Sequence, residues 1–153
     1  MADRITKSIR VSAPIQKVYQ TWSDFENFPL FMENIKAIWM IGPRTSIWEA
    51  EGPMGSLIKW KAETVEMEDE KAIQWRSIDD EDTDVQTDGV VTFNPITSDS
   101  TLVTVSLRYT PKGGAAGQAA ARIFSNPEKQ LEADLDNFKT LLEKGEIPKA
   151  AKK

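Results

Sequence analysis

Between residues 35 and 110, apolar and polar side chains alternate with a period of two in several separate segments. Successive side chains of a β-strand point to opposite faces, so this pattern predicts an antiparallel meander with one apolar and one wet face. Turns rich in Gly, Pro, Asp and Ser are expected at 41–45, 51–55, 66–71, 79–89 and 94–100. The predicted apolar faces comprise Ser46, Trp48 and Ala50; Ile58, Trp60, Ala62 and Thr64; Ile73 and Trp75; Val91 and Phe93; and Thr101, Val103, Val105, Leu107 and Tyr109.

Helices are predicted on both sides of this region. Residues 128–144 form the clearest one, beginning after Asn126-Pro127 and ending at Gly145. A first strand is expected over 5–11, followed by a helix that Ser12 or Ala13 caps and Pro14 begins. The apolar stripes of the two helices are Leu131, Leu135, Phe138 and Leu142, and Ile15, Val18, Tyr19 and Trp22.

The segment 22–32, WSDFENFPLFM, is too apolar for a surface loop, and Pro29 breaks it too early for a long helix. We expect a second short helix that Pro29 separates from the first. A helix of residues 128–144 is about 25 Å long and about 10–12 Å thick, whereas seven strands make a sheet about 30 Å wide. The rest of the inner face must be covered by large side chains, the N-terminal helices or a ligand, and the segment 22–32 is predicted to wall or lid that space.

Composition excludes several kinds of chemistry. The chain has no cysteine and no histidine, which rules out Cys-containing zinc sites, disulfides, Cys nucleophiles and Ser-His triads. A net charge of -5 argues against nucleic acid as a partner. No apolar run approaches the roughly 20 residues of a membrane span, and the first residues lack an apolar signal core, so we expect a cytoplasmic protein.

Two motifs fail on spacing. Asp80, Asp82 and Asp84 could begin a calcium loop, but Val85 and Val91 stand where that loop needs Gly and Glu. The glycines of 113–117 do not follow the dinucleotide-binding spacing. We therefore expect no metal ion and no cofactor.

The order of these elements resembles the START and polyketide cyclase/dehydrase superfamily (SRPBCC), which includes birch-allergen-like and coenzyme-Q-binding START-domain proteins. The segments that carry the resemblance are 11–32, 46–63, 73–77, 89–93, 109–114 and 130–146. It implies an α+β helix-grip fold, in which a curved antiparallel sheet of about seven strands wraps around a long C-terminal helix, with two short helices after the first strand. It also implies one domain over 1–147 and a disordered tail over 148–153.

Relatives of this kind bind lipids, sterols, quinones, hormones or polyketides, often in a cavity between sheet and helix. For this chain the resemblance and the aromatic strand positions together predict a ligand-binding set, although the same residues could form a filled core. The set is Phe28, Phe31, Trp48, Trp60, Trp75, Phe93, Tyr109, Phe124, Leu135 and Phe138. The loop Gly52, Pro53, Met54 and Gly55 is predicted to gate the cavity, or else to be an ordinary tight turn.

The leading hypothesis is a non-catalytic binding or carrier protein for a small hydrophobic molecule such as a lipid, quinone or polyketide. The alternatives are a cyclase or dehydrase-like enzyme and a protein-interaction module with a filled core. For acid–base chemistry the polar candidates are Glu63, Arg76, Arg108 and Tyr109. Strand parity places the first three on the wet face, so only Tyr109 is expected inside and no catalytic residue is assigned.

Overall fold

The computed structural model describes residues 4–51, 57–78, 83–111, 118, 121, 123 and 126–145. The predicted gate loop 52–55, Phe124 and the tail 148–153 lie outside the described residues. The elements in chain order are β1 (Ile5–Val11), α1 (Ile15–Ser23), the 3-10 helix η1 (Phe25–Leu30), β2 (Ile35–Met40), β3 (Thr45–Glu51), β4 (Leu57–Glu68), β5 (Ala72–Ser77), β6 (Val85–Thr97), β7 (Ser100–Pro111) and α3 (Pro127–Lys144).

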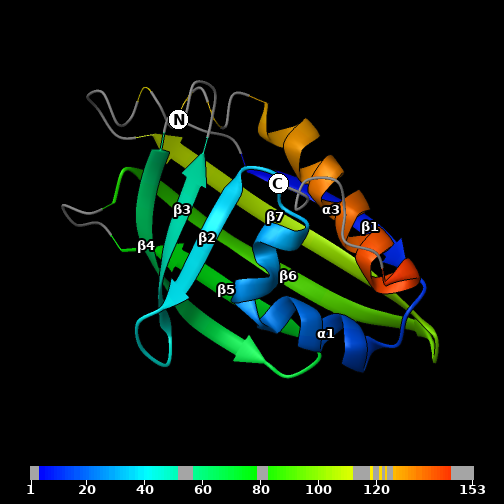
Figure 1. The fold of residues 1–153 in the computed structure, drawn as a ribbon. Coiled ribbons are helices and arrows are strands. Elements are labelled where there is room, and N and C mark those ends of the chain that lie inside the picture. Colours follow the sequence, from blue (N-terminus) through cyan, green and yellow to red (C-terminus); the bar gives the residue numbers. More distant parts are fainter. Residues whose placement is uncertain are drawn as a thin grey trace.

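The strands form one curved antiparallel sheet in the order β1-β7-β6-β5-β4-β3-β2 (Figure 1). Strands β2 to β7 pair in chain order as a meander, and β1 joins the sheet beside β7. The predicted α+β arrangement of seven strands is therefore confirmed. The concave face carries the apolar phase of each strand, including Ile58, Trp60 and Ala62, which are all buried.

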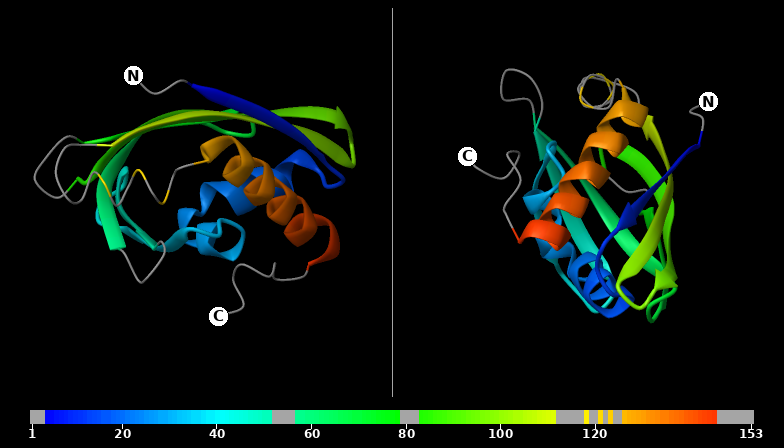
Figure 2. Two further views of the ribbon diagram at one scale, coloured as in Figure 1. Left: turned by 90° about the horizontal axis from the view of Figure 1, so that it is seen from above. Right: turned by 90° about the vertical axis from the view of Figure 1, so that its right-hand side faces the viewer.

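Helices α1 and α3 lie on the concave side of the sheet, as the view from above shows (Figure 2). The predicted stripe of α3 is buried, from Leu131 to Leu142. Asn126 caps the helix, because its side chain accepts from Lys129 N, and Gly145 ends it at φ 66°. Because both signals are present in the sequence, the predicted bounds 128–144 differ from the observed bounds by only one residue, at the N-terminal end.

The N-terminal helices begin and break at different residues from those predicted. Pro14 takes the N-cap position of α1 with φ -65° and ψ 150°, so neither Ser12 nor Ala13 caps the helix. The break between α1 and η1 falls at Asp24, whose ψ is 92°, and Pro29 lies inside η1. A short 3-10 helix tolerates the missing N–H of proline, since Phe28 O still accepts from Phe31 N and Met32 N.

Several predicted turns are too long; residues 66–68 of the turn predicted over 66–71, for example, belong to β4. Residues 85–89 of the turn predicted over 79–89 belong to β6, and the turn predicted over 94–100 shrinks to the two residues between Thr97 and Ser100. Asp88 is tolerated within β6 because it points to the outer face, where Arg108 of β7 neutralises it. The polar composition of these segments predicted turns, but their polar residues form the solvent-exposed face of the strands.

Candidate functional site

The interior beneath α3 is filled by aromatic rings that meet at Trp22, the last buried residue of α1. Its indole contacts the rings of Phe28, Phe31, Phe93 and Phe138 at centroid distances of 5.0–6.4 Å. Four of the predicted ligand-binding residues, Phe31, Phe93, Leu135 and Phe138, are buried in this core and do not border the pocket described below.

A pocket of about 50 Å³ lies between this core, the concave sheet face and the first turns of α3. Its apolar walls include five of the predicted ligand-binding residues, Phe28, Trp48, Trp60, Trp75 and, through its ring, Tyr109. The polar residues that border it include Asn34, Thr87, Gln130 and Asp134. The structure thus brings half of the predicted set around one space.

The tryptophan wall is held in place by the sheet. Trp48 and Trp60 are paired across β3 and β4, and their rings stack at 5.7 Å with an interplanar angle of 22°. Trp48 Nε1 also donates to Ser46 Oγ at 2.9 Å, which fixes the orientation of this indole. Both side chains are buried, so this wall is rigid and largely apolar.

Trp75 lies on Gly89, its partner across β5 and β6. A Cβ atom at position 89 would stand 2.5 Å from Trp75 Cζ2 and 2.9 Å from the carbonyl oxygen of Ser106. Only glycine allows the indole to lie this close to the sheet. Gly89 therefore sets how far Trp75 protrudes into the pocket.

A smaller cavity of about 10 Å³ adjoins the pocket. The two spaces share Trp22, Phe28, Trp48 and Trp75 as walls. The indole of Trp75, which is only partly buried, is the least enclosed of these four dividing side chains. Movement of the Trp75 side chain would join the pocket to the adjoining space.

Three buried polar atoms have no hydrogen-bond partner among the described residues: Trp22 Nε1, Thr87 Oγ1 and Gln130 Oε1. All three belong to residues that border the pocket. Gln130 Nε2 donates to the carbonyl oxygen of Ile123, which fixes the amide so that its oxygen is the unpaired atom. An unpaired buried polar group costs about 1–3 kcal/mol, so three around one pocket form a cluster that calls for an explanation.

Asp134 is the acidic residue of α3 that borders the pocket. Burial raises the pKa of its carboxyl group to about 7, although the backbone N–H of Glu33, which donates to Asp134 Oδ1 at 3.3 Å, opposes this shift. Burial also raises the pKa of Tyr109, and the charge of Asp134 adds to the effect. The phenol therefore stays protonated near neutral pH, while the carboxyl group is close to half-ionised.

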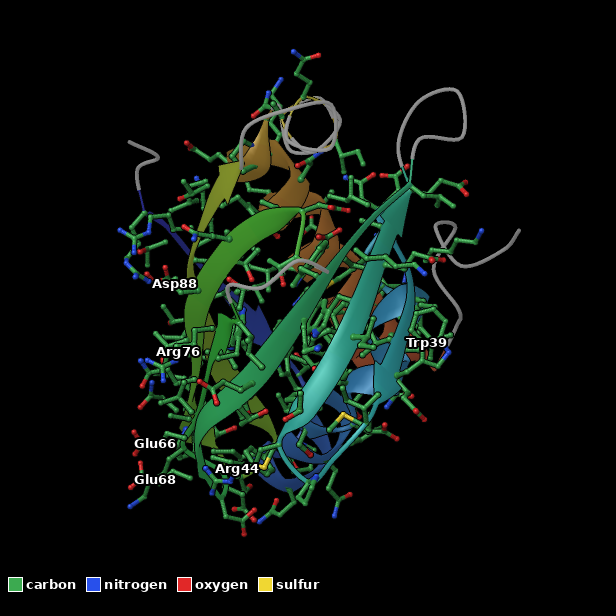
Figure 3. The ribbon with its side chains drawn as sticks, turned by 90° about the vertical axis from the view of Figure 1, so that its left-hand side faces the viewer. Trp39, Arg44, Glu66, Glu68, Arg76 and Asp88 are labelled. Atoms are coloured by element: carbon green, nitrogen blue, oxygen red, sulfur yellow. The ribbon has the colours of Figure 1, made fainter. Side chains whose placement is uncertain are left out.

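The outer face of the sheet carries the other acid–base candidates. Arg76 Nε pairs with Glu63 Oε1 at 2.8 Å, and Arg108 pairs with Asp88 Oδ2 at 2.8 Å. Figure 3 shows Arg76 and Asp88 along this outer side. Asp88 and Arg108 also border the pocket, but their charged ends neutralise each other, and Arg4 joins them. The predicted outward orientation of Glu63, Arg76 and Arg108 is consistent with this pairing.

No group of three or more potential metal-ligating side chains occurs within residues 4–51, 57–78, 83–111 and 126–145. Asp84, the described member of the aspartate motif, instead accepts from Lys59 N at 2.9 Å. No helix among the described parts of the chain is long and apolar enough to cross a membrane.

The chain has a curved antiparallel sheet that wraps around its C-terminal helix, with an aromatic-lined pocket between them. This arrangement is the helix-grip fold. Residues 11–136 match the family described as polyketide cyclase/dehydrase and lipid transport, and the chain belongs to that family.

Two solved structures share the fold. The protein DR_A0006 of Deinococcus radiodurans is 27% identical, with a TM-score of 0.74 over 94% of this chain and 99% of that one. A START superfamily protein of Mycobacterium smegmatis is 18% identical, with a TM-score of 0.71 and the same coverage. An uncharacterised 17.2 kDa protein of Streptomyces lincolnensis is 25% identical over 92% of this chain and 89% of its own length.

Sequence reasoning did not include Thr87, Gln130 and Asp134 among the pocket residues, whereas Trp22 belongs to the segment 22–32 that was predicted to wall this space. Gln130 and Asp134 are four residues apart and each directly precedes a leucine of the buried stripe. That spacing places both on one flank of the helix, facing the sheet edge. Two polar residues beside the buried stripe could have indicated this edge of the pocket. The charged residues around them made this flank look like an ordinary solvent-exposed face.

Proposed function

We propose that this protein binds a small, mostly apolar molecule in the pocket between the sheet and α3. The observation that supports the proposal is the cluster of unpaired polar atoms on Trp22, Thr87 and Gln130, all on residues that border one aromatic-lined space. A folded protein gives up stability for each such group. A ligand that pairs with them recovers that free energy on binding.

The three atoms indicate the polar character of the ligand. Trp22 Nε1 can only donate, so the ligand must supply an acceptor. Gln130 Oε1 can only accept, so the ligand must supply a donor. A hydroxyl group does both, whereas a quinone offers acceptors alone. Neutral hydroxylated ring compounds therefore fit the pocket better than quinones.

Charge disfavours fatty acids as well. Of the two acidic residues at the pocket, Asp88 pairs with Arg108, whereas Asp134 would repel a second carboxylate. The guanidinium of Arg108 already pairs with Asp88. Among the pocket-lining residues that the structure describes, no other cation is present. The proposed ligand is thus neutral, ring-shaped and hydroxylated.

Size sets a further requirement. A space of about 50 Å³ holds a few water molecules, whereas ligand pockets usually measure about 300–1,000 Å³. The ligand must therefore displace part of the aromatic wall, and Trp75 is the partly buried member of that wall. We propose that its movement joins the pocket to the adjoining cavity of about 10 Å³.

The test is a thermal-shift and calorimetric series with a naphthol, the corresponding naphthoquinone and a saturated fatty acid. The naphthol should raise Tm, and the other two should raise it much less. Mass spectrometry of extracts from protein purified without denaturation should identify a neutral hydroxylated compound. Equal responses to all three probes, or no response together with an empty protein, would refute the proposal.

A second candidate function is a cyclase or dehydrase-like reaction, which the presence of Asp134 and Tyr109 at the same pocket favours. A carboxyl group with a pKa of about 7 can accept and return a proton at neutral pH. Tyr109, protonated at this pH, can donate a hydrogen bond to a carbonyl oxygen where negative charge develops. Loss of turnover in Asp134→Asn with ligand binding retained would support catalysis; full turnover in that variant would exclude this role.

A further inference from the structure

A second hollow of about 300 Å³ lies at the other end of the concave face. The pocket described above borders Ile35 at the start of β2, whereas this hollow borders Met40 at its end. It opens between the junction of α1 with η1, the turn between β2 and β3, and the last part of β4. We refer to it as the Arg44 groove; Figure 3 shows Arg44 at this end of the sheet.

Arg44 is a positioned cation in the groove. Its carbonyl oxygen accepts from Thr64 N at 2.8 Å, and its Nη1 donates to the carbonyl oxygen of Val65 at 3.3 Å. No carboxylate of the described residues forms an ion pair with it. One corner of the guanidinium is thus anchored on β4, while the remaining N–H groups can bind an anion with the directional geometry that arginine favours.

Asp24 brings an opposite charge to the same groove. It is exposed between α1 and η1, and its side chain caps neither helix. It forms no ion pair with Arg44 or with another cation in the described part of the chain. The groove therefore presents a cation and an anion that are both available and do not neutralise each other.

Apolar side chains line much of the rest of the groove. Met40 and Met67 are 41% and 43% exposed, which is high for long apolar side chains. Phe25 and Pro43 complete this surface. Methionine side chains adapt readily to the shape of an apolar ligand.

We propose that the Arg44 groove is a separate binding site for an apolar α-amino acid. The α-carboxylate would pair with Arg44, the α-ammonium with Asp24, and the side chain would lie on Met40 and Met67. A groove of about 300 Å³ has the size of a small ligand site. The two charges select a zwitterion, because a simple anion faces Asp24 and a simple cation faces Arg44. This site does not depend on the pocket ligand.

The test follows backbone amide shifts by NMR as phenylalanine is added at millimolar concentration to the 153-residue chain. The amide signals of residues 40–42, 44–45 and 64–67 should move and saturate. Phenethylamine, which lacks the carboxylate, and 3-phenylpropanoate, which lacks the ammonium, should each bind about tenfold more weakly, because each loses one charge-assisted contact.

Two variants separate the charges. Arg44→Gln and Asp24→Asn should each weaken phenylalanine binding by about tenfold. Both residues are exposed, so both variants should fold, and their spectra report this directly. Arg76→Gln on the outer face is the matched control and should leave binding unchanged. The absence of shifts in the groove overturns the proposal, as does equal binding of either truncated analogue or unchanged binding by the two groove variants.

Discussion

Thr87→Val tests whether the pocket keeps an unpaired hydroxyl for its ligand. Thr87 is 5% exposed and its Oγ1 has no partner among the described residues. Valine has the same shape and removes the desolvation cost, which is about 1–3 kcal/mol for an unpaired buried group. We expect the free energy of unfolding to rise by about 1 kcal/mol and Tm by roughly 2–4 °C. Affinity for the naphthol probe should fall about 3–10-fold, the equivalent of one hydrogen bond.

Thr101→Val is the matched control. Thr101 is also buried on the sheet, but its Oγ1 donates to the carbonyl oxygen of Ala13 at 3.0 Å. The same substitution there leaves that oxygen unpaired and should lower stability by about 1–2 kcal/mol without changing ligand affinity. Urea unfolding measures the stabilities, and calorimetry measures the affinities. The reasoning fails if Thr87→Val is destabilised like Thr101→Val, or if it binds the probe as tightly as the parent protein.

Three further predictions follow from other contacts. Gly89→Ala should cost about 1–3 kcal/mol by overpacking against Trp75 and should shift tryptophan fluorescence, whereas Gly42→Ala, with 3.9 Å of clearance, should be nearly neutral. The pKa of Asp134, about 7 in the folded protein, lies above the usual value of about 3.9 for an unfolded chain. The stability that its neutral form contributes below about pH 4 should therefore be lost as pH rises from about 4 to about 7, and a Tm–pH profile of Asp134→Asn should lack this loss. Arg76→Ala should change stability by less than about 0.5 kcal/mol and leave ligand binding intact, since its ion pair is exposed; a loss of binding would place it in the site.

The sheet and the long helix could be predicted from the sequence because local patterns determine both. Alternation identified the buried face of β4, and the spacing of Leu131 and Leu135 identified the buried stripe of α3. Errors occurred where a polar strand face resembles a turn. Asp88 looked like a loop residue because its partners, Arg4 and Arg108, are far away in the chain.

The pocket was only half predictable, because packing partners are not a local property. Aromatic residues on the correct strand phase were all candidates, and nothing in the sequence separated Trp48, which borders the pocket, from Phe93, which packs against Trp22. The polar residues were harder to find still. Whether Thr87 has a hydrogen-bond partner depends on what β7 and α3 place beside it.

The unpaired polar atoms around the pocket favour a ligand-binding site rather than a core that is filled by side chains. A filled core gains most by replacing unpaired polar groups with apolar ones, so Trp22 Nε1, Thr87 Oγ1 and Gln130 Oε1 should not gather around one space in such a core. A ligand that supplies both a donor and an acceptor would pair with these atoms, so their grouping around one space is expected for a binding site. Thr87→Val therefore separates a binding site from a filled core, because it should stabilise the ligand-free protein and weaken ligand binding.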